Sequence, residues 1–371
     1  MNYAKDPRIV LTLDAGGTNS VFSAIRSNEE IVEPVTLPTR VNDLDECLST
    51  VADGFKRVQS ALTGKAAAIS FAFPGPADYP NGIIGDLQNL PCFRGGVALG
   101  PMLEERFNLP VFINNDGDLF AYGEAISGFL PRLNAKLSDA ASPKTYRNLL
   151  GVTLGTGFGA GIVRDGDLFI GDNAAAAEIW AVRNKKYPAF PVEESVSIRG
   201  IQREYAVRTG VPFEHAPDPK AIFEMATGRK PGDRQAARAA FETMGEALGD
   251  ALANAVTLID GPVVIGGGLS GAHTLFMPAL IHEMNSTLRK WNGDEVGRME
   301  PKAYNLEEPT ACDAFLKGSV REIAIPGSGR KLLHDPQKRI GIGLSVLGTS
   351  KAVSVGAYAF ALHALDTRRQ P

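Results

Sequence analysis

The sequence predicts an α/β protein built from two similar halves, and two observations carry this expectation. A short apolar run, a glycine-rich turn and a second apolar run occur twice, at residues 9–25 and again at 150–163, and this pattern is typical of a β-hairpin. Strand-like and helix-like segments then alternate after each hairpin, which favours mixed sheets with helices on both faces. Because the two hairpins lie a domain's length apart, we expect a duplicated architecture.

Each further element follows from the spacing of its apolar residues. In the first half we expect an amphipathic helix at 43–62, a strand at 66–73, a helix at 98–107, a short strand at 111–113 and a helix at about 118–127. In the second half we expect helices at 194–209, 219–227 and 233–258, a strand at 263–265 and a helix at 353–365. Gly245 and Gly249 are spaced for close packing of the longest helix. Residues 131–148 are polar, show no clear period and are expected to form an excursion between the two halves, and residues 293–340 are expected to be irregular.

Composition and charge exclude several classes of protein. A chain of 371 residues has room for two to three domains of about 150 residues. Its formal net charge of −4 and pI near 5.8 are unlike those of a nucleic-acid-binding protein. Hydrophobic residues at 44% and charged residues at 22% exclude disorder as the main state.

The cysteines and the apolar runs predict a soluble cytoplasmic protein. Cys47, Cys92 and Cys312 form no CxxC pair, which argues against disulfides and a cysteine-rich zinc site. The first apolar run ends at Asp14 and is too short for a signal peptide. No run approaches the roughly 18 apolar residues of a membrane span. We therefore expect neither a membrane nor a nucleic acid as partner.

Glycine is in excess, at 40 residues, and three glycine-rich turns directly follow apolar strands. They are DAGGTN at 14–19, GTGFG at 155–159 and GGGLSG at 266–271. Glycine lets a ligand approach backbone N–H groups closely, and successive N–H groups in a turn bind phosphate. One such turn could simply be a tight hairpin, but three favour a phosphate site. The Walker pattern and a strand-bound GxGxxG are absent, which disfavours P-loop and Rossmann proteins.

Seven motifs occur in an order that resembles the ROK family of bacterial sugar kinases, part of the actin/Hsp70/hexokinase superfamily. They are DAGGTN, FPGPAD at 73–78, QNL at 88–90, INNDGDLFAYGE at 113–124, GTGFGAGIVRDG at 155–166, AAEIW at 176–180 and VIGGGLS at 264–270. The resemblance covers roughly residues 8–365. It implies a two-domain actin-like ATPase (ribonuclease H-like) fold with a cleft between the domains. Residues 1–127, completed by the C-terminal helix at 353–371, would form one domain and 128–352 the other.

The resemblance also implies roles for individual residues. Asp116 would be the catalytic carboxylate, and Asp14 would face the Mg²⁺ of Mg-ATP through water. The nucleotide-binding residues would be Asp14, Gly16, Gly17, Thr18, Asn19, Gly155, Thr156, Gly157, Gly159, Gly266, Gly267 and Gly268. The sugar-binding residues would be Gly75, Asn89, Asn115, Asp116, Glu178 and Glu193.

The chemistry of these side chains agrees with such roles, although each has a plainer alternative. Phosphoryl transfer to a hydroxyl needs a carboxylate that accepts its proton, and Asp116 follows a strand, where open α/β sheets bind ligands. Asp116 could instead cap the following helix. Glu178 could be a surface residue. Glu193 competes with Glu194, and its assignment depends on Ser197 four residues later.

One segment departs from the family pattern. Family members carry EIGH followed by a CxCGxxGC cluster that binds structural zinc, whereas this chain reads EIWA at 178–181 and continues VRNKKYPAFPVE without Cys or His. We therefore expect no zinc, with Tyr187 and Phe190 as an apolar anchor in its place. Ala181 replaces the sugar-facing His, so we expect looser recognition at the sugar's 1- and 2-positions unless Asn184 takes over.

The sequence thus predicts ATP-dependent phosphorylation of the 6-hydroxyl of a hexose, with glucose as the first candidate, by a homo-oligomeric enzyme that uses Mg-ATP. An N-acetylhexosamine kinase and a catalytically weak ROK-type sugar-binding or regulatory protein are alternatives. A transcriptional regulator is disfavoured because few residues precede the first strand and the net charge is negative. An acetate-type kinase lacks the sugar-side motifs. The sequence leaves open which hexose and which nucleotide bind.

Overall fold

The computed structural model describes residues 3–15, 19–39, 43–75, 77–85 and 91–367. The chain divides into two compact units. The N-terminal unit comprises Met1–Gly128, Gly161–Ala177 and Val346–Pro371, and the C-terminal unit comprises Phe129–Ala160 and Glu178–Ser345. Residues 161–177 and 346–352 belong to the first unit in this grouping, whereas the expected domain division assigned both to the second.

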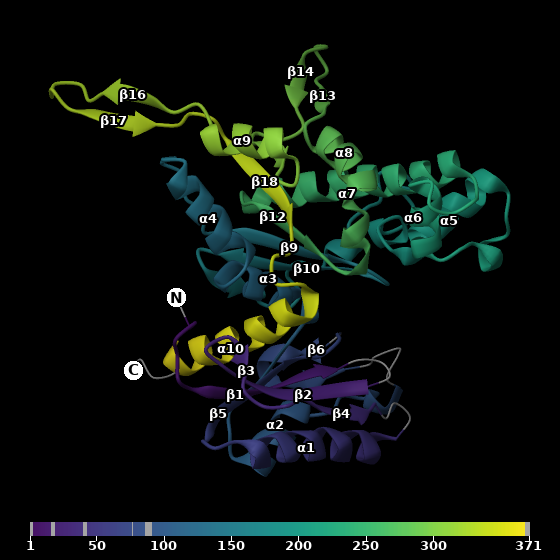
Figure 1. The fold of residues 1–371 in the computed structure, drawn as a ribbon, viewed down its shortest axis with the longest axis vertical. Coiled ribbons are helices and arrows are strands. Elements are labelled where there is room, and N and C mark those ends of the chain that lie inside the picture. The colour runs from purple at the N-terminus through teal and green to yellow at the C-terminus, as the bar shows by residue number, and fades with distance from the viewer. Residues whose placement is uncertain (1–2, 16–18, 40–42, 76, 86–90, 368–371) are drawn as a thin grey trace. The chain divides into compact units, whose positions relative to one another are not determined.

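The N-terminal unit is built on a six-stranded mixed sheet (Figure 1). Its elements are β1 (Ile9–Ala15), β2 (Asn19–Arg26), β3 (Glu29–Glu30), β4 (Val35–Pro38), α1 (Leu44–Ala61), β5 (Ala66–Ala72), β6 (Ala77–Asp78), β7 (Ile83–Ile84), α2 (Leu99–Phe107), β8 (Val111–Asn114), α3 (Asp116–Ile126) and α10 (Thr349–Thr367). The strand order is β3-β2-β1-β5-β8, with β4 paired to β2. Strand β1 is antiparallel to β2 and parallel to β5, which is parallel to β8.

Helices cover both faces of this sheet. Alternate side chains of a strand point to opposite faces, and Ile9, Leu11 and Leu13 of β1 share a buried cluster with Val51 and Phe55 of α1. Helix α10 packs against β1, β5 and β8, on the face opposite α1 (Figure 1). The loops at the strand ends are therefore attached to a sheet that is packed against helices on both faces.

Two glycines let α3 and α10 approach each other closely. A Cβ atom on Gly123 would collide with the Ala352 carbonyl, and one on Gly356 would collide with the Leu119 carbonyl. Gly123 of the INNDGDLFAYGE motif is therefore required for helix packing. Its neighbour Glu124 is fully buried and accepts hydrogen bonds from the N–H groups of Val346 and Leu347, both at 3.0 Å, just before α10.

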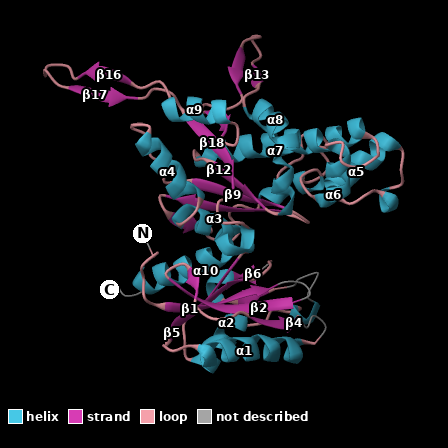
Figure 2. Cartoon of the chain, viewed as in Figure 1, coloured by secondary structure: helices cyan, strands magenta, loops and turns pink. Residues whose placement is uncertain are grey.

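The C-terminal unit repeats this plan (Figure 2). Its elements, with the two strands that continue the hairpin into the first unit, are α4 (Phe129–Asp139), β9 (Leu149–Leu154), β10 (Phe158–Arg164), β11 (Asp167–Phe169), α5 (Ile198–Thr209), α6 (Pro219–Ala226), α7 (Arg234–Ile259), β12 (Val263–Gly266), α8 (His273–Met284), β13 (Thr287–Arg289), β14 (Glu295–Gly297), β15 (Lys302–Asn305), α9 (Pro309–Lys317), β16 (Arg321–Ala324), β17 (Lys331–His334) and β18 (Arg339–Leu344). The order is β11-β10-β9-β12-β18-β15. The series β10-β9-β12-β18 matches β2-β1-β5-β8, which confirms the expected pair of similar α/β halves.

The segment 131–148, in which the sequence showed no clear period, begins as a helix. In α4, Phe129, Leu130, Leu133 and Leu137 are all buried, and their spacing is that of one helix face. Pro131 lies in the first turn, where a helix loses no hydrogen bond to proline. The apolar period was present in the sequence, and the proline and polar residues obscured it.

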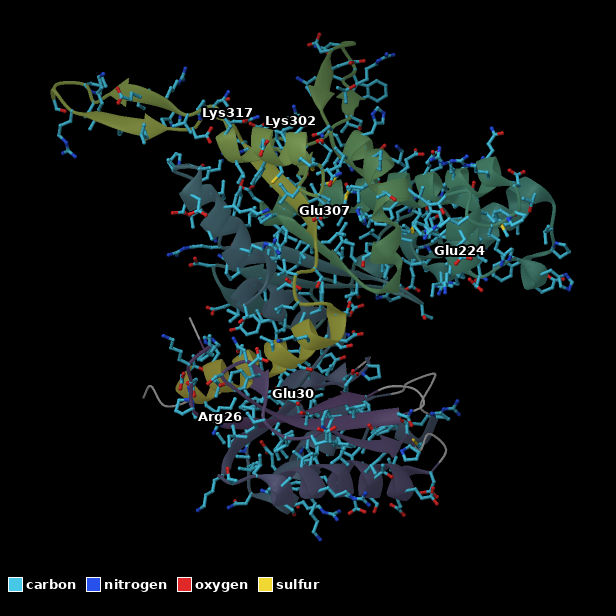
Figure 3. The ribbon with its side chains drawn as sticks, in the orientation of Figure 1. Arg26, Glu30, Glu224, Lys302, Glu307 and Lys317 are labelled. Atoms are coloured by element: carbon cyan, nitrogen blue, oxygen red, sulfur yellow. The ribbon has the colours of Figure 1, made fainter. Side chains whose placement is uncertain are left out.

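The expectation for 293–340 is also wrong. This segment contains β14, β15, α9, the β16–β17 hairpin and the first two residues of β18. Strand β18 lies between β12 and β15 and is parallel to both. Strand β18 has glycine at alternate positions because a Cβ on Gly341 would meet Leu306, and one on Gly343 would meet the Phe129 ring. Glycine has low strand propensity, so the local pattern did not indicate a central strand. Glu307 (Figure 3) accepts a hydrogen bond from the Leu344 N–H at 2.9 Å.

The prediction for the long helix is confirmed. A Cβ on Gly245 of α7 would collide with the Phe276 carbonyl, and one on Gly249 would lie 2.7 Å from the Leu280 carbonyl oxygen. Both partners belong to α8, so the two glycines allow close helix contact. Within the described residues, no helix has the length and apolar character needed to cross a membrane.

Candidate functional site

The junction of β8 and α3 places Asn115 and Asp116 next to each other at the end of β8, the last strand in the order of the N-terminal sheet. Asn115 is the N-cap of α3, and its Oδ1 accepts a hydrogen bond from the Gly117 N–H at 2.8 Å. Asp116 is the first residue of the helix. The alternative in which Asp116 serves as the cap is therefore wrong, because Asn115 has that role, and α3 starts two residues earlier than expected.

The Asp116 carboxyl has a raised pKa. Its side chain is accessible to solvent, yet the protein atoms around it remove much of the water that would stabilise the charged form, and this desolvation is the largest cause. The negative charge of Asp14 acts in the same direction, while hydrogen bonds from the Gly117 N–H and its own N–H lower the pKa. Accessible carboxyls with raised pKa values are suited to accept a proton during catalysis.

Tyr79 connects this junction with Phe73 and Gly75 of the FPGPAD motif, and the sequence analysis missed it. Its hydroxyl donates a hydrogen bond to the Phe73 carbonyl at 3.0 Å and accepts one from Nδ2 of Asn115 at 3.4 Å. A Cβ on Gly75 would lie 2.9 Å from that hydroxyl. The glycine is therefore needed to admit the tyrosine, and Gly75, Tyr79 and Asn115 lie together. The only signal in the sequence was a tyrosine directly after FPGPAD.

Part of the first glycine turn lies outside the described residues. This applies to Gly16, Gly17 and Thr18, and to Asn89 of the QNL motif. Asp14 and Asn19 are described, near the end of β1 and at the start of β2 respectively, and both are exposed. Their positions place a carboxylate and an amide at the edge of the turn.

The second glycine turn, residues 155–159, is held by the start of α5. Within the turn, the Gly155 N–H donates to the Gly157 carbonyl at 3.0 Å. From α5, the Ile198 N–H donates to the Gly155 carbonyl at 2.9 Å, and Nη1 of Arg199 donates to the Thr156 carbonyl at 3.0 Å. The turn is thus fixed by groups distant from it in the sequence.

Glu193 also contacts this turn. Its Oε2 accepts a hydrogen bond from the Phe158 N–H at 2.9 Å, and its Oε1 pairs with Nη2 of Arg199 at 2.5 Å. A Cβ on Gly157 would lie 2.9 Å from Oε2, while the φ angle of Gly157 is not positive. Gly157 therefore does not adopt the left-handed backbone conformation that would by itself require glycine. This glycine makes room for the Glu193 carboxylate.

The neighbouring acids have other partners. Glu194 accepts from Nε of Arg199 at 2.9 Å and pairs with Nη1 of Arg203 at 2.8 Å. Glu178 is exposed, and its carboxylate accepts a hydrogen bond from the Trp180 indole N–H. Of these three acids, Glu193 is the one whose carboxylate bonds to the second glycine turn.

The third turn contains glycines with different functions. Gly267 has a φ of 85°, and a Cβ there would collide with the Leu154 backbone. A Cβ on Gly268, or on Gly155 of the second turn, would meet no atom of the described residues within 4 Å. Gly267 therefore serves packing, while Gly268 and Gly155 border open space. Bare backbone beside open space fits the approach of phosphate groups.

The loop at 182–192 is organised by a buried amide. The Asn184 side chain is fully buried, its Nδ2 donates to the Ser195 hydroxyl at 2.8 Å, and its Oδ1 accepts from the N–H groups of Lys186 and Tyr187 at 2.9 and 3.2 Å. The Val192 N–H closes the loop on the Val182 carbonyl at 2.8 Å. Because these contacts engage both polar ends of the amide, Asn184 has a structural role.

Ion pairs attach the same loop to the α7–α8 helix pair. Nζ of Lys185 lies 2.6 Å from Glu283 and 3.2 Å from Glu246, which Lys186 also reaches at 2.6 Å. The expected apolar anchor is wrong: Tyr187 and Phe190 are 44% and 56% exposed. Among the described residues, no group of three or more His, Cys, Asp or Glu side chains could hold a metal ion.

The sequence profile of the ROK family matches residues 10–311. The chain belongs to the ROK family. Its sequence is 56% identical to that of glucokinase from Parabacteroides distasonis, whose crystal structure superposes with a TM-score of 0.90. The match covers 98% of this chain and 99% of the glucokinase chain. The ROK hexokinase from Thermus thermophilus is 19% identical in sequence, with a match that covers 96% of this chain and 99% of the hexokinase chain. The TM-score of 0.66 shows that the two proteins share a fold. The expected actin-like ATPase fold is thereby confirmed.

Curated relatives within the family carry a different sugar in their names. N-acetyl-D-glucosamine kinase from Vibrio cholerae serotype O1 is 29% identical over 274 residues, which are 71% of this chain and 85% of that protein. This ROK chain is thus similar to kinases of glucose and of an N-acetylated hexosamine. In this member of the ROK family, the loop at 182–192 is held by the buried Asn184 side chain and by the ion pairs of Lys185 and Lys186 with glutamates.

Proposed function

We propose that this chain is an ATP-dependent hexose kinase that phosphorylates the 6-hydroxyl of glucose. Sugar kinase activity is supported by membership of the ROK family and by every relative described above. Glucose as the substrate rests on one observation, the 56% identity to a glucokinase over nearly the full length of both chains.

In this proposal, Asp116 accepts the proton of the sugar hydroxyl during phosphoryl transfer. Its accessible carboxylate and raised pKa support this role. Asn115 would bind the sugar through its side chain while it caps α3. Gly75, Asn89, Glu178 and Glu193 remain the other proposed sugar contacts.

The glycine turns would hold the triphosphate. The open space beside Gly155 and Gly268 supports close approach of the nucleotide to the backbone N–H groups. Asp14, at the end of β1, would hold Mg²⁺ through water. Mg²⁺, when bound, neutralises charge on the transferring phosphate. The further proposed nucleotide contacts are Gly16, Gly17, Thr18, Asn19, Thr156, Gly157, Gly159, Gly266 and Gly267.

An N-acetylhexosamine kinase is the second candidate, because the curated relatives are N-acetyl-D-glucosamine kinases. Ala181, which can neither donate nor accept a side-chain hydrogen bond, supports a site that discriminates little at the 2-position. A site that does bond a hydroxyl rejects analogues lacking it by orders of magnitude. A cytoplasmic location and a homo-oligomeric state stay predictions.

An ADP-release assay over glucose, mannose, N-acetylglucosamine, N-acetylmannosamine and 2-deoxyglucose tests the proposal. We expect the highest kcat/KM for glucose, and a value for 2-deoxyglucose within about 100-fold of it, because no His lies at position 181. A higher kcat/KM for an N-acetylated sugar would replace glucose by the second candidate. Sugar binding without ADP release would indicate a non-catalytic sugar-binding protein.

A further inference from the structure

Arg199 connects two parts of the C-terminal unit that the proposed function assigns to different substrates. One nitrogen, Nη2, pairs with Glu193, and another, Nη1, donates to the Thr156 carbonyl in the second glycine turn. The third, Nε, donates to Glu194. The guanidinium thus uses all three of its nitrogens on this region, a geometry that the planar fork of arginine permits and a lysine ammonium does not.

The location of Arg199 on α5 is electrostatically unfavourable by itself. Ser197 caps the helix, which starts at Ile198, so Arg199 is the second residue of the first turn. The N-terminus of a helix carries a partial positive charge and disfavours cations. Pairing with Glu193 and Glu194 offsets that repulsion, and the arginine is therefore held at its position by these two acids and the Thr156 carbonyl.

The orientation of Glu193 and the conformation of the turn depend on each other. The same carboxylate that pairs with Arg199 accepts the Phe158 N–H, at the end of the turn, and borders Gly157. A sugar hydroxyl that forms a hydrogen bond with Glu193 would favour one orientation of this carboxylate. A phosphate bound to the turn would favour one backbone conformation at Thr156 and Phe158. Two ligands that act on one hydrogen-bonded group alter each other's affinity reciprocally.

We propose that Arg199 is a positioning residue that couples sugar binding to nucleotide binding by holding Glu193 and the second glycine turn in one arrangement. The inference rests on the proposed function, which assigns the carboxylate to the sugar and the turn to the nucleotide. Arg203 is the matched control, because it pairs with the same Glu194 but makes no contact with Glu193 or the turn among the described residues.

Calorimetry of glucose binding, with and without a non-hydrolysable ATP analogue, measures the coupling. We expect the analogue to raise the glucose affinity of the wild-type protein at least about fivefold, the lower range for coupled sites. Arg199→Met reduces this factor to about one, while Arg203→Met keeps it. Arg199→Lys retains the charge but only part of the fork, and gives an intermediate factor; it carries the test if Arg199→Met does not fold.

Steady-state kinetics separate this role from a purely structural one. Because Arg199→Met loses the coupling, its KM for glucose becomes independent of the ATP concentration. Arg203→Met keeps the coupling, so its KM for glucose still depends on the ATP concentration. Unchanged coupling in the folded Arg199 variants, or no coupling in the wild-type protein, overturns the inference while sugar turnover keeps the proposed function intact. Absence of hexose binding by the wild-type protein overturns the proposed function, and this inference with it.

Discussion

The β8–α3 junction and the second glycine turn both follow buried strands, but their carboxylates have opposite surroundings. In the part of the chain that the structure describes, Asp116 accepts hydrogen bonds only from backbone N–H groups and has no cationic partner. Glu193 is engaged by the Phe158 N–H and by Arg199. The pKa of Asp116 is raised chiefly because the surrounding protein removes water from its carboxyl, and also because of the nearby charge of Asp14. Glu193, in contrast, takes part in an ion pair that fixes the second glycine turn.

Asp116→Asn is expected to have the largest effect. The amide cannot accept a proton, so kcat should fall at least about 100-fold, while the Kd for glucose changes little. A carboxyl whose pKa is raised on folding contributes stability below its unfolded pKa and loses it as pH rises through the folded pKa. The ionised group therefore destabilises the protein at pH 7, and the variant should have a higher Tm.

The pH profile provides the control for this variant. Because the pKa of Asp116 is raised, the wild-type kcat should decline as pH falls, at a pH above the ordinary aspartate value of about 3.9. The residual activity of Asp116→Asn should lack that decline. A near-wild-type kcat for Asp116→Asn would show that Asp116 does not act in catalysis. The proposed difference in role between Asp116 and Glu193 would then be wrong.

Asn184→Ala tests whether the surroundings of Glu193 are as rigid as the comparison requires. The change leaves the Ser195 hydroxyl and two backbone N–H groups without their partner, and a buried unsatisfied polar group costs about 1–3 kcal/mol. The free energy of unfolding in urea should fall by that amount. Tyr187→Phe, which removes an exposed hydroxyl bond to Glu204, is the matched control and should stay close to wild type.

Gly157→Ala sharpens the comparison within the turn. The added Cβ would lie 2.9 Å from Oε2 of Glu193 and displace it from the Phe158 N–H. Losing one hydrogen bond, about 1 kcal/mol, should raise the KM values for ATP and glucose about fivefold. Gly155→Ala adds a Cβ in open space and should raise the KM for ATP alone. Equal effects of both variants on glucose would contradict the proposed contact.

The smallest effect is expected from metal removal. The loop at 182–192 is held by Asn184 and by lysine–glutamate pairs, so a chelator should leave the Tm of the nucleotide-free protein unchanged. The lysines of these pairs are exposed, while Glu283 is buried. Because salt screens charges that are open to solvent, 1 M NaCl should lower the Tm only slightly. Elemental analysis that finds one zinc per chain would contradict this account of the loop.

Local patterns predicted those elements that are marked by the spacing of their own apolar residues or by a glycine-rich turn. The two hairpins, α1 and α7 follow from apolar period and glycine placement, and all of them formed as expected. Strand β18 was missed because its glycines are required by Leu306 and Phe129, side chains that come from other segments. No local pattern contains that information, since what requires each glycine is a neighbour brought close only by folding.

The candidate site divides in the same way. The sequence by itself determined the ROK family, the three glycine turns, and Asn115 and Asp116 at a strand end, because these depend on motifs of consecutive residues. The tertiary structure decided that Asn115 caps α3, that Glu193 and not Glu194 contacts the turn, and that Arg199 joins them. Phe158 and Glu193 are 35 residues apart. A hydrogen bond at that separation depends on folding that brings the start of α5 to the glycine turn, where Ile198 and Arg199 bond to the Gly155 and Thr156 carbonyls, and no local pattern of residues encodes that approach.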